Sequence, residues 1–377
     1  MRVFHIAPYY PPHLGGLQQA VKNLATAQSK NGLDVTVITS NKPKKTPSRD
    51  KPDDGVRVIR LRCVDVGHTP LMPLLLFVLL FRIKKDDIVH VHFAQSYVNE
   101  VVALFSKLTD HPFVFHYHGD VLASGPLGRL LPFYKMHILK FSLQQASTII
   151  YPSEDFKQRI LKKFPFLEDK ESFVMPNGID LPKMDQTKHR ASNKFLTASR
   201  LSKVKNIGAM LEAFVEARGK APNIELYIAG EGDEEASLKK IVNRLQANSY
   251  IHFLGNLEQG ELKKHYMNSS VFLVTAKRES FGMSIAEAMS YGLPVVAFNA
   301  PAVRELIRDN FNGLLIDRFS KHDFANSIAK LAIDPKVRKR LSANALKTVE
   351  VFEGKEVAEG YNDIYRRIMS SPLKVEV

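Results

Sequence analysis

Short apolar runs rich in β-branched residues alternate along the chain with stretches whose apolar positions recur every three or four residues. The runs have the length of buried strands, and the stretches between them have the period of amphipathic helices. In the first half we predict strands at residues 3–7, 35–39, 88–92, 113–116 and 148–151, with helices at 17–30, after 96, around 133–145 and from 153. Strands separated by helices are typical of a parallel, doubly wound α/β sheet.

The same alternation begins again in the second half of the chain. There we predict strands at residues 195–198, 225–229, 250–253, 271–275 and 294–298, most of them followed by helices. Between the two halves, residues 176–193 hold two prolines, a glycine and scattered charges, which is the composition of a linker. The chain has 377 residues, beyond the roughly 250–300 at which a single core stops growing, so we predict two Rossmann-like domains, 1–182 and 183–356.

The net charge of the chain is strongly positive. Lysine and arginine number 53 against 39 aspartates and glutamates, which gives +14 and favours an anionic partner such as a nucleic acid, a phospholipid or a phosphorylated small molecule. Residues 1–150 hold 18 basic and 10 acidic side chains and the rest of the chain holds 35 and 29, so the excess is denser near the N-terminus. The sequence has no run of five basic residues, no Cys/His finger and no tryptophan, which argues against a dedicated nucleic-acid module.

The compartment is predicted from the single cysteine and from the apolar segments. Cys63 alone gives no disulfide framework, and the first residues lack the apolar core of a signal peptide, so we expect a cytoplasmic protein. The longest apolar run, residues 71–81, contains Pro73, ends at Arg82 and is shorter than the ~20 residues that span a bilayer. Two interpretations of this run stay open: a buried helix of the α/β core, or an interfacial helix with a basic end that lies on a membrane.

The most informative segment follows the predicted strand 271–275 and opens a helix. From Glu279 to Glu287 it reads Glu-Ser-Phe-Gly-Met-Ser-Ile-Ala-Glu. Amides at a helix N-terminus bind anions, and Gly282 lets the backbone approach a ligand closely. Carboxylates such as Glu279 and Glu287 accept hydrogen bonds from paired hydroxyl groups of a ribose or a hexose. A helix with an acidic first turn is the simpler explanation, but it accounts for Glu279 alone.

Two cations follow the first predicted strand of the second half. Arg200 and Lys205 lie just ahead of the next helix, at the carboxyl edge of a parallel sheet, where doubly wound folds bind their ligands. Two fixed positive charges there can neutralise a diphosphate leaving group without a metal ion. A solvated basic loop is the alternative, and the acidic segment that ends at Glu287 favours the binding site over it.

Two turns in the first half are weaker candidates. Gly15 and Gly16 separate the first strand from the first helix and permit close approach to a phosphate, although their spacing matches neither the dinucleotide fingerprint nor a P-loop. His118 and Asp120 follow the strand at 113–116, where a His–Asp pair can polarise a hydroxyl group or bind a sugar.

The remaining histidines of this region do not predict a metal site. His90 and His92 alternate along a predicted strand, and the spacing of His118 and Asp120 is not that of metal ligands. We therefore interpret His90 and His92 as ordinary strand residues.

Taken together, these motifs resemble the retaining glycosyltransferases of the GT-B fold, glycosyltransferase family 4 (glycosyl transferases group 1). The resemblance spans nearly the whole chain, and the two glutamates separated by seven residues are its signature. It rests on Gly15-Gly16, His118-Gly119-Asp120, Pro176-Asn177-Gly178-Ile179-Asp180, Arg200 with Lys205, and Glu279 with Glu287.

The resemblance implies two Rossmann-like domains that face a central cleft, with the last helix, within 357–377, crossing back to the first domain. It also implies a UDP- or GDP-sugar as donor, with no cofactor and no metal. The implied catalytic residues are Glu279, which binds the transferred sugar, and His118, which touches it near the reacting carbon. The implied binding residues are Arg200 and Lys205 for the diphosphate, Glu287 for the ribose, Leu257 near the base, Gly15, Gly16 and Asp120 in the first domain, and the amides of Phe281, Gly282 and Met283.

The acceptor is implied to bind the N-terminal domain. The basic excess there and the apolar run at 71–81 suit a glycan or a lipid-linked acceptor and peripheral attachment to an anionic membrane surface. The alternative function is a catalytically degenerate sugar-nucleotide binder, or a subunit of a glycan assembly complex. A nicotinamide oxidoreductase is disfavoured because no G-x-G-x-x-G follows a strand, and no segment resembles the Schiff-base lysine region of the pyridoxal-phosphate-dependent phosphorylases.

Overall fold

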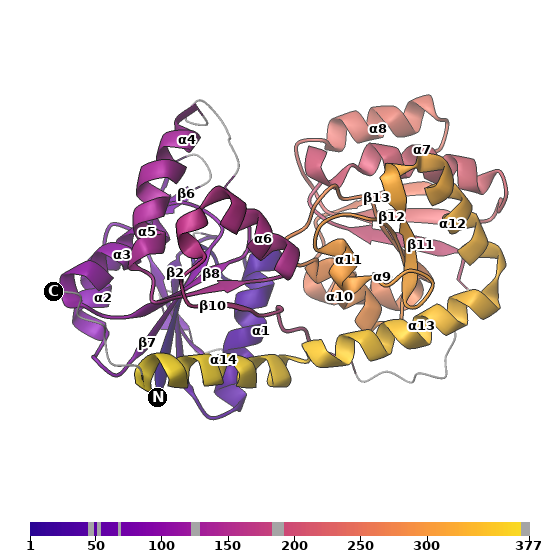
Figure 1. Ribbon diagram of the computed structural model, residues 1–377. Coiled ribbons are helices and arrows are strands. Elements are labelled where there is room, and N and C mark those ends of the chain that lie inside the picture. Colours follow the sequence, from indigo (N-terminus) through magenta and orange to yellow (C-terminus); the bar gives the residue numbers. More distant parts are fainter. Residues whose placement is uncertain (44–48, 51–53, 67–68, 122–128, 183–191, 371–377) are drawn as a thin grey trace. The chain divides into compact units, whose positions relative to one another are not determined.

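The computed structural model describes residues 1–43, 49–50, 54–66, 69–121, 129–182 and 192–370 (Figure 1). The chain divides into two compact units: unit 1 comprises residues 1–178 and 354–377, and unit 2 comprises residues 179–353. The predicted boundaries at 182 and 356 lie a few residues from these positions. Residues 183–191 of the predicted linker lie outside the described part of the chain.

Unit 1 is built on a twisted, mainly parallel sheet. Its strands are β1 (Arg2–Ile6), β2 (Asp34–Ser40), β3 (Arg49–Asp50), β4 (Arg57–Leu61), β7 (Ile88–Phe93), β8 (Phe113–Tyr117), β9 (Thr148–Tyr151) and β10 (Ser172–Val174). In space their order is β10-β9-β8-β7-β1-β2-β4-β3, and each neighbouring pair is parallel except β3 with β4. A separate antiparallel pair joins β5 (Val64–Val66) to β6 (Thr69–Leu71).

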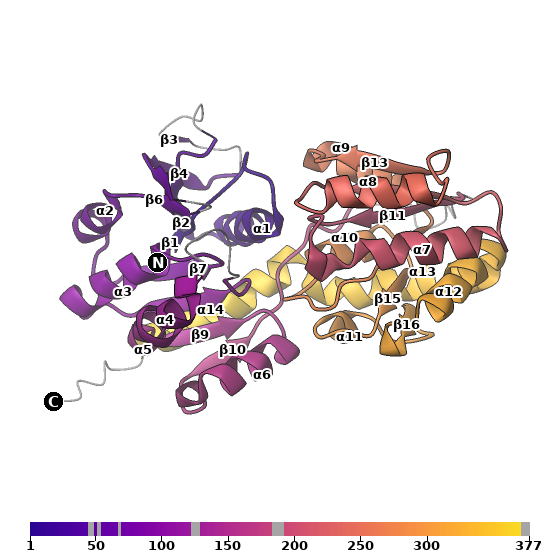
Figure 2. The same ribbon diagram turned by 90° about the horizontal axis from the view of Figure 1, so that it is seen from above.

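Helices cover both faces of this sheet (Figure 2). They are α1 (Gly16–Lys30), α2 (Leu75–Arg82), α3 (Val98–Thr109), α4 (Leu131–Phe133), a π-helical turn (Tyr134–Leu139), α5 (Lys140–Gln145), α6 (Glu154–Lys163) and α14 (Gly354–Ser370). Alternate side chains of the strands point to opposite faces. Those on one face, such as Val3 and Ile88, pack under α1 and α14, and those on the other, such as Phe4 and Val89, pack against α2, α3, α5 and α6.

Unit 2 holds a wholly parallel sheet. Its strands are β11 (Lys194–Ala198), β12 (Glu225–Ala229), β13 (Ile251–Gly255), β14 (Val271–Val274), β15 (Val295–Phe298) and β16 (Gly313–Ile316), in the spatial order β13-β12-β11-β14-β15-β16. Its helices are α7 (Ile207–Arg218), α8 (Glu235–Arg244), α9 (Gln259–Asn268), α10 (Met283–Ser290), α11 (Val303–Leu306), α12 (Lys321–Ile333) and α13 (Pro335–Val349). Two apolar clusters of buried residues, one on each face, form its core.

The apolar run at 71–81 begins at the last residue of β6 and continues into α2, and only one side of that helix is buried. Leu75 and Leu79 are fully buried in the core, whereas Phe77 is 56% exposed and Phe81 is 86% exposed. One side of the helix thus packs into the core, and its outer side presents apolar rings to solvent, so each of the two interpretations describes one side of α2. No helix among the described residues is both long and apolar enough to cross a membrane.

Candidate active site

The strand order of unit 2 identifies where a ligand would bind. From β11 the chain builds outward through β12 to β13, and then returns to place β14 on the other side of β11. In open parallel sheets, ligands bind outside the carboxyl ends of the two strands at which the winding direction reverses. The loops after β11 and β14 carry Arg200 and Lys205, and Glu279 and Gly282, so the predicted residues of both motifs lie at this reversal point.

The two loops are bonded to each other. Lys205 forms an ion pair with Glu279, and both side chains are only partly exposed, at 22% and 14%. The Thr275 hydroxyl donates to the Lys205 carbonyl at 3.0 Å, and the Lys277 amide donates to the Val204 carbonyl at 2.9 Å. The structure therefore brings together a cation and a carboxylate that lie 74 residues apart in the sequence.

The loop before α10 has the backbone conformation that the glycine was expected to allow. Gly282 precedes the helix with a φ of 100°, a left-handed value that is unfavourable for other residues. An added Cβ there would lie 3.0 Å from the Ile285 Cδ1 atom. Phe281 is buried with its ring edge-on to Phe352, and Met283 is half-buried, so Phe281 can offer a ligand only its backbone.

Glu287 lies within α10 in an environment that favours its neutral form. Burial raises the pKa of its carboxyl group to about 7, even though Tyr266 and Lys263 both act to lower it. The buried Tyr266 hydroxyl donates to the Glu287 Oε2 atom at 3.2 Å. Glu287 is therefore protonated more readily than an ordinary glutamate, and its protonated form can accept a hydrogen bond through one oxygen and donate through the other.

The other two predicted residues of unit 2 are placed differently. Arg200 is exposed in the loop after β11, so its guanidinium is accessible to a ligand. Leu257 follows Gly255, the last residue of β13, and packs partly against the core. The described contacts do not link Leu257 to the Lys205–Glu279 pair.

The glycine turn of unit 1 caps α1. Gly15 precedes the helix with a φ of 153°, and an added Cβ there would lie 2.4 Å from the Gln18 Oε1 atom. Gly16 is the first residue of the helix and is exposed, so the amides of this first turn are open to an anion.

His118 and Asp120 each have a different partner in the structure. His118 is bonded through its Nε2 atom to the Nδ1 atom of His92, at 2.8 Å. The Oδ1 atom of Asp120 lies 2.8 Å from the Lys135 ammonium group, and its Oδ2 atom pairs with Lys163. Burial alone would raise the pKa of Asp120, but the two lysines lower it below its usual value. The geometry favours a role for Asp120 in ordering this loop, because both of its oxygens are occupied.

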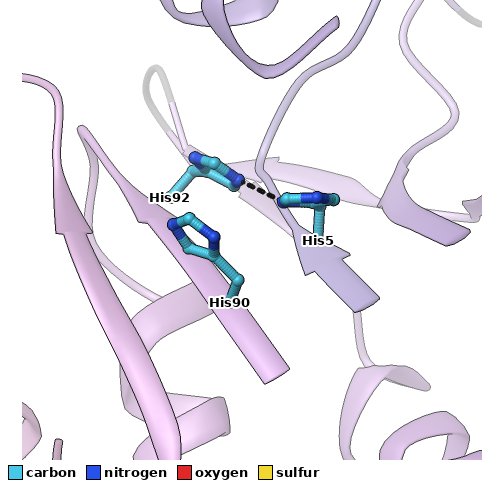
Figure 3. Close-up of side chains that lie close together, drawn as sticks. All are labelled: His5, His90 and His92. Atoms are coloured by element: carbon cyan, nitrogen blue, oxygen red, sulfur yellow. Dashed lines mark hydrogen bonds between the residues drawn. The ribbon is translucent and has the colours of Figure 1, made fainter. Parts of the chain in front are cut away.

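Sequence reasoning missed a cluster of buried histidines next to His118. His5, His90, His92 and His116 point from β1, β7 and β8 to one face of the sheet, under α1 and α14, and Figure 3 shows three of them together. His90 and His92 lie in a strand, β7, as predicted, and in addition their buried rings are bonded to other members of the cluster. Their alternation along the strand was the signal, but the strand register that sets His5 beside His90 and His92 beside His116 is not visible in the sequence.

The ring nitrogens of this cluster are near enough to one another to be considered as metal ligands. Two sets, His5 with His90 and His92, and His92 with His116 and His118, have nitrogens within 4.8 Å of one another. These nitrogens are bonded to each other and to neighbouring polar groups of unit 1.

Comparison with protein families accounts for both units. The model described as Glycosyltransferase Family 4 matches residues 14–183, and the model described as Glycosyl transferases group 1 matches residues 183–348. The chain belongs to the GT-B glycosyltransferases. The fold predicted from the sequence is thereby confirmed, as two parallel-sheet units of the GT-B type.

This glycosyltransferase is similar over nearly its whole length to characterised proteins. It is 23% identical to alpha-monoglucosyldiacylglycerol synthase of Acholeplasma laidlawii, over 97% of this chain and 96% of that one. It is also 23% identical to GDP-mannose:cellobiosyl-diphosphopolyprenol alpha-mannosyltransferase of Xanthomonas campestris, over 100% and 99% of the two chains. The crystal structure of HepE of Anabaena in complex with UDP and glucose has a TM-score of 0.76 and 19% identity, and it covers 97% of this chain and all of that one.

Proposed function

We propose that this glycosyltransferase moves a hexose from a UDP- or GDP-sugar to a hydroxyl acceptor, with retention of the anomeric configuration. The observation that carries the proposal is the Lys205–Glu279 pair at the reversal point of the unit 2 sheet. A sugar nucleotide has a diphosphate beside a polyhydroxylated ring. The Lys205 cation can bind the diphosphate, and the neighbouring Glu279 carboxylate can accept hydrogen bonds from the hydroxyl groups of the ring. The similarity to HepE, whose crystals hold UDP and glucose, supports the same class of donor.

The other residues of the unit 2 site have roles that follow from their chemistry. Arg200 adds a second, accessible cation for the diphosphate. The amides near Gly282 hold the sugar hydroxyls beside Glu279, and Glu287 binds the ribose through its partly protonated carboxyl group. Leu257 lines the base. In unit 1, Gly15 and Gly16 supply amides for a phosphate, and His118 acts on the transferred sugar.

The proposed reaction balances without a covalent enzyme intermediate. The bond between C1 of the sugar and the leaving phosphate oxygen breaks, and the acceptor oxygen bonds to C1 on the same face. The acceptor proton passes to the departing phosphate. Arg200 and Lys205 stabilise the negative charge that develops on the diphosphate, which is where fixed charges lower a barrier most. A sugar trapped covalently on Glu279 or Asp120 during turnover would contradict this step.

A panel of sugar nucleotides tests the donor. We expect UDP-glucose, UDP-N-acetylglucosamine or GDP-mannose to raise the melting temperature of the protein, since a ligand at 100 times its dissociation constant stabilises by about 2.7 kcal/mol. The stabilising donor should be hydrolysed slowly, and proton NMR of the first sugar released should show the anomer of the donor. Stabilisation without any hydrolysis or transfer would favour a degenerate binding protein, and release of the opposite anomer would contradict retention.

For the acceptor, we propose a lipid-linked substrate presented at an anionic membrane surface. Two relatives named above carry a lipid in their names, diacylglycerol in one and a diphosphopolyprenol in the other. Phe77 and Phe81 are exposed on α2, and the basic side chains of Arg82 at its end and of Lys84 and Lys85 just after it are exposed as well. Apolar side chains flanked by basic ones are typical of helices that lie in a membrane interface.

Vesicle sedimentation tests the membrane proposal. At low salt we expect the protein to sediment with vesicles of phosphatidylglycerol and phosphatidylcholine, and less so as salt screens the basic residues. The double variant Phe77→Ser/Phe81→Ser should lose most of this binding. Ile333→Ser, which removes an equally exposed apolar side chain from unit 2, is the matched control and should bind as the unchanged protein does. Absence of binding at low salt would contradict the proposed membrane attachment and would favour a soluble glycan as the acceptor.

A further inference from the structure

The buried histidines of unit 1 form part of one continuous chain of hydrogen bonds. His5 and His90 are fully buried, and His92 and His116 are each 1% exposed. Four imidazoles without contact to water are costly unless their polar atoms are bonded within the protein. The bonds that satisfy them run from β8 through β7 and β1 to α1, and then through α14 back to β7 and β8.

The first part of this chain of hydrogen bonds connects His118 to Gln28. The His118 Nε2 atom lies 2.8 Å from the His92 Nδ1 atom. The His92 Nε2 atom in turn lies 2.9 Å from the His5 Nδ1 atom, and Figure 3 shows this second bond. The His5 Nε2 atom then lies 2.8 Å from the Oε1 atom of Gln28, which is buried on α1. Three hydrogen bonds therefore separate His118 from the Gln28 side-chain carbonyl.

The second part of the chain of hydrogen bonds continues from the Gln28 side-chain amide. The Gln28 Nε2 atom donates to the Tyr365 hydroxyl at 3.3 Å, and that hydroxyl lies 2.6 Å from the His90 Nδ1 atom. The His90 Nε2 atom lies 3.2 Å from the His116 Nδ1 atom, and the His116 Nε2 atom lies 3.3 Å from the Tyr361 hydroxyl. Both tyrosines belong to α14, so the C-terminal helix supplies two members.

Each imidazole in the chain is neutral at physiological pH. Burial lowers the pKa of His5 to about 4 and that of His118 to about 3. Burial, together with repulsion between neighbouring rings, holds the pKa of His90, His92 and His116 well below the usual value for histidine. A neutral imidazole has one N–H donor and one bare nitrogen acceptor, so a chain of such rings must point all its hydrogen bonds in one direction.

The Gln28 amide sets that direction. Its Oε1 atom has no hydrogen, so His5 must donate from Nε2 and accept at Nδ1. His92 must then donate from Nε2 to His5, and His118 must donate from Nε2 to His92. On the other side, the Gln28 side-chain N–H donates to the Tyr365 hydroxyl, which donates to His90. His90 then donates to His116, so the direction of donation continues unchanged. We infer that Gln28, acting through His5 and His92, fixes His118 as the Nε2–H tautomer, with an unprotonated Nδ1 atom that can accept a hydrogen bond.

The role of this tautomer in sugar transfer rests on the proposed function. Among the described residues, no hydrogen bond reaches the Nδ1 atom of His118, so that lone pair is available to a ligand. A bare Nδ1 accepts a hydrogen bond from a hydroxyl of the transferred sugar, and it cannot act as an acid or as a cation. Gln28 is then a positioning residue that never touches the substrate, and its loss leaves His118 in place with its tautomer no longer fixed.

A metal ion in the cluster is the competing explanation, and the geometry favours the hydrogen bonds. Two histidine nitrogens bound to one tetrahedral Zn²⁺ at about 2.0–2.1 Å lie roughly 3.3 Å apart. The His5 Nδ1 and His92 Nε2 atoms are 2.9 Å apart, which is the length of a hydrogen bond. The single consistent direction of the chain also leaves no nitrogen of His5, His90, His92 or His116 without a partner.

NMR of the whole protein, labelled with ¹⁵N-histidine, tests the inference without substrate. The signals of His118, identified by their loss in His118→Asn, should show a protonated Nε2 and a bare Nδ1 at pH 7. In Gln28→Met, which keeps the size of the side chain and removes its oxygen, we expect a mixture of the two tautomers and a three- to tenfold loss of kcat/KM, about the value of one hydrogen bond. Gln28→Glu retains an acceptor toward His5 and should restore both the tautomer and the activity.

Tyr365→Phe is the matched control, because it breaks the chain on the far side of Gln28 and should leave the tautomer of His118 unchanged. A proton on His118 Nδ1 in the unchanged protein, a single unaltered tautomer in Gln28→Met, or the visible absorption of tetrahedral Co²⁺ after its addition would each overturn the inference. The expected tautomer in a protein that transfers no sugar would instead contradict only the proposed function.

Discussion

Replacing Lys205 with methionine is expected to lower the kcat/KM of sugar transfer about 10²–10³-fold, the range seen when one preorganised group that stabilises developing charge is removed. Lys205 is held by Glu279 and by the loop after β14, so it is in position before the donor arrives. The substitution also leaves the Glu279 carboxylate without its counter-ion, beside the position proposed for the diphosphate. We therefore expect calorimetry to show weaker binding of UDP and GDP as well.

The neighbouring Lys203 provides the matched control for this result. It is exposed in the same short 3₁₀ turn, two residues before Lys205, and Lys203→Met removes the same charge from unit 2. Its activity should stay within twofold. In the double variant Lys205→Met/Glu279→Gln, part of the lost nucleotide affinity should return, because the uncompensated carboxylate is gone. Equal losses in Lys203→Met and Lys205→Met would show that only overall charge matters.

Replacing Gly230 with alanine is expected to destabilise unit 2 by about 3–5 kcal/mol, which is at the upper end for a single substitution. Gly230 follows β12 with a φ of 124°, and an added Cβ would lie 2.0 Å from the carbonyl oxygen of Ser199. That oxygen belongs to the backbone at the end of β11 and cannot move without shifting Arg200. Urea unfolding followed by far-UV circular dichroism measures the loss, and molecules that still fold should also transfer sugar more slowly.

Gly260→Ala is the corresponding control for stability. Gly260 lies in α9, and an added Cβ there meets no atom within 4 Å. Alanine in a helix is favoured over glycine by up to about 1 kcal/mol, so the unfolding midpoint should stay the same or rise. A midpoint for Gly230→Ala that matches the one for Gly260→Ala would mean that the β11 and β12 ends can separate at little cost.

Most of the sheet follows from local sequence pattern. The strands around residues 3, 35, 88, 113 and 148 are observed within one or two residues of their predicted bounds, because each is rich in β-branched or aromatic residues and is buried along nearly its whole length. The strands β4, β10 and β16 were not predicted. Arg57–Leu61 carries two arginines in five residues, Ser172–Val174 is only three residues long, and Gly313–Ile316 opens with a glycine, so their pairing depends on the neighbouring strands rather than on their own composition.

Some residues of the candidate site are likewise predictable from local sequence, and others depend on tertiary folding. Glu279, Gly282 and Glu287 lie within one short segment, and Lys205 lies just after a strand, so their types and spacing were readable in the sequence. The partners of Asp120 and His118 could not be predicted from the sequence. Tertiary folding brings Lys135 and Lys163 to Asp120, and it brings His92 to His118. The histidine chain needed the register of β1, β7 and β8 together with a helix more than 240 residues further along the sequence.

The return of α14 to unit 1 affects the order in which the protein can fold during synthesis. Unit 2 is continuous in sequence and is complete once residue 353 has left the ribosome, whereas unit 1 still lacks α14 at that moment, although most of it was made first. Until α14 arrives, α1 is the helix among the described residues that packs on the sheet face carrying Val3, Ile88 and the histidines. A nascent chain thus exposes a partly polar, partly apolar sheet face until residues 354–370 have emerged, and exposed apolar surface of this kind makes a folding intermediate prone to aggregation.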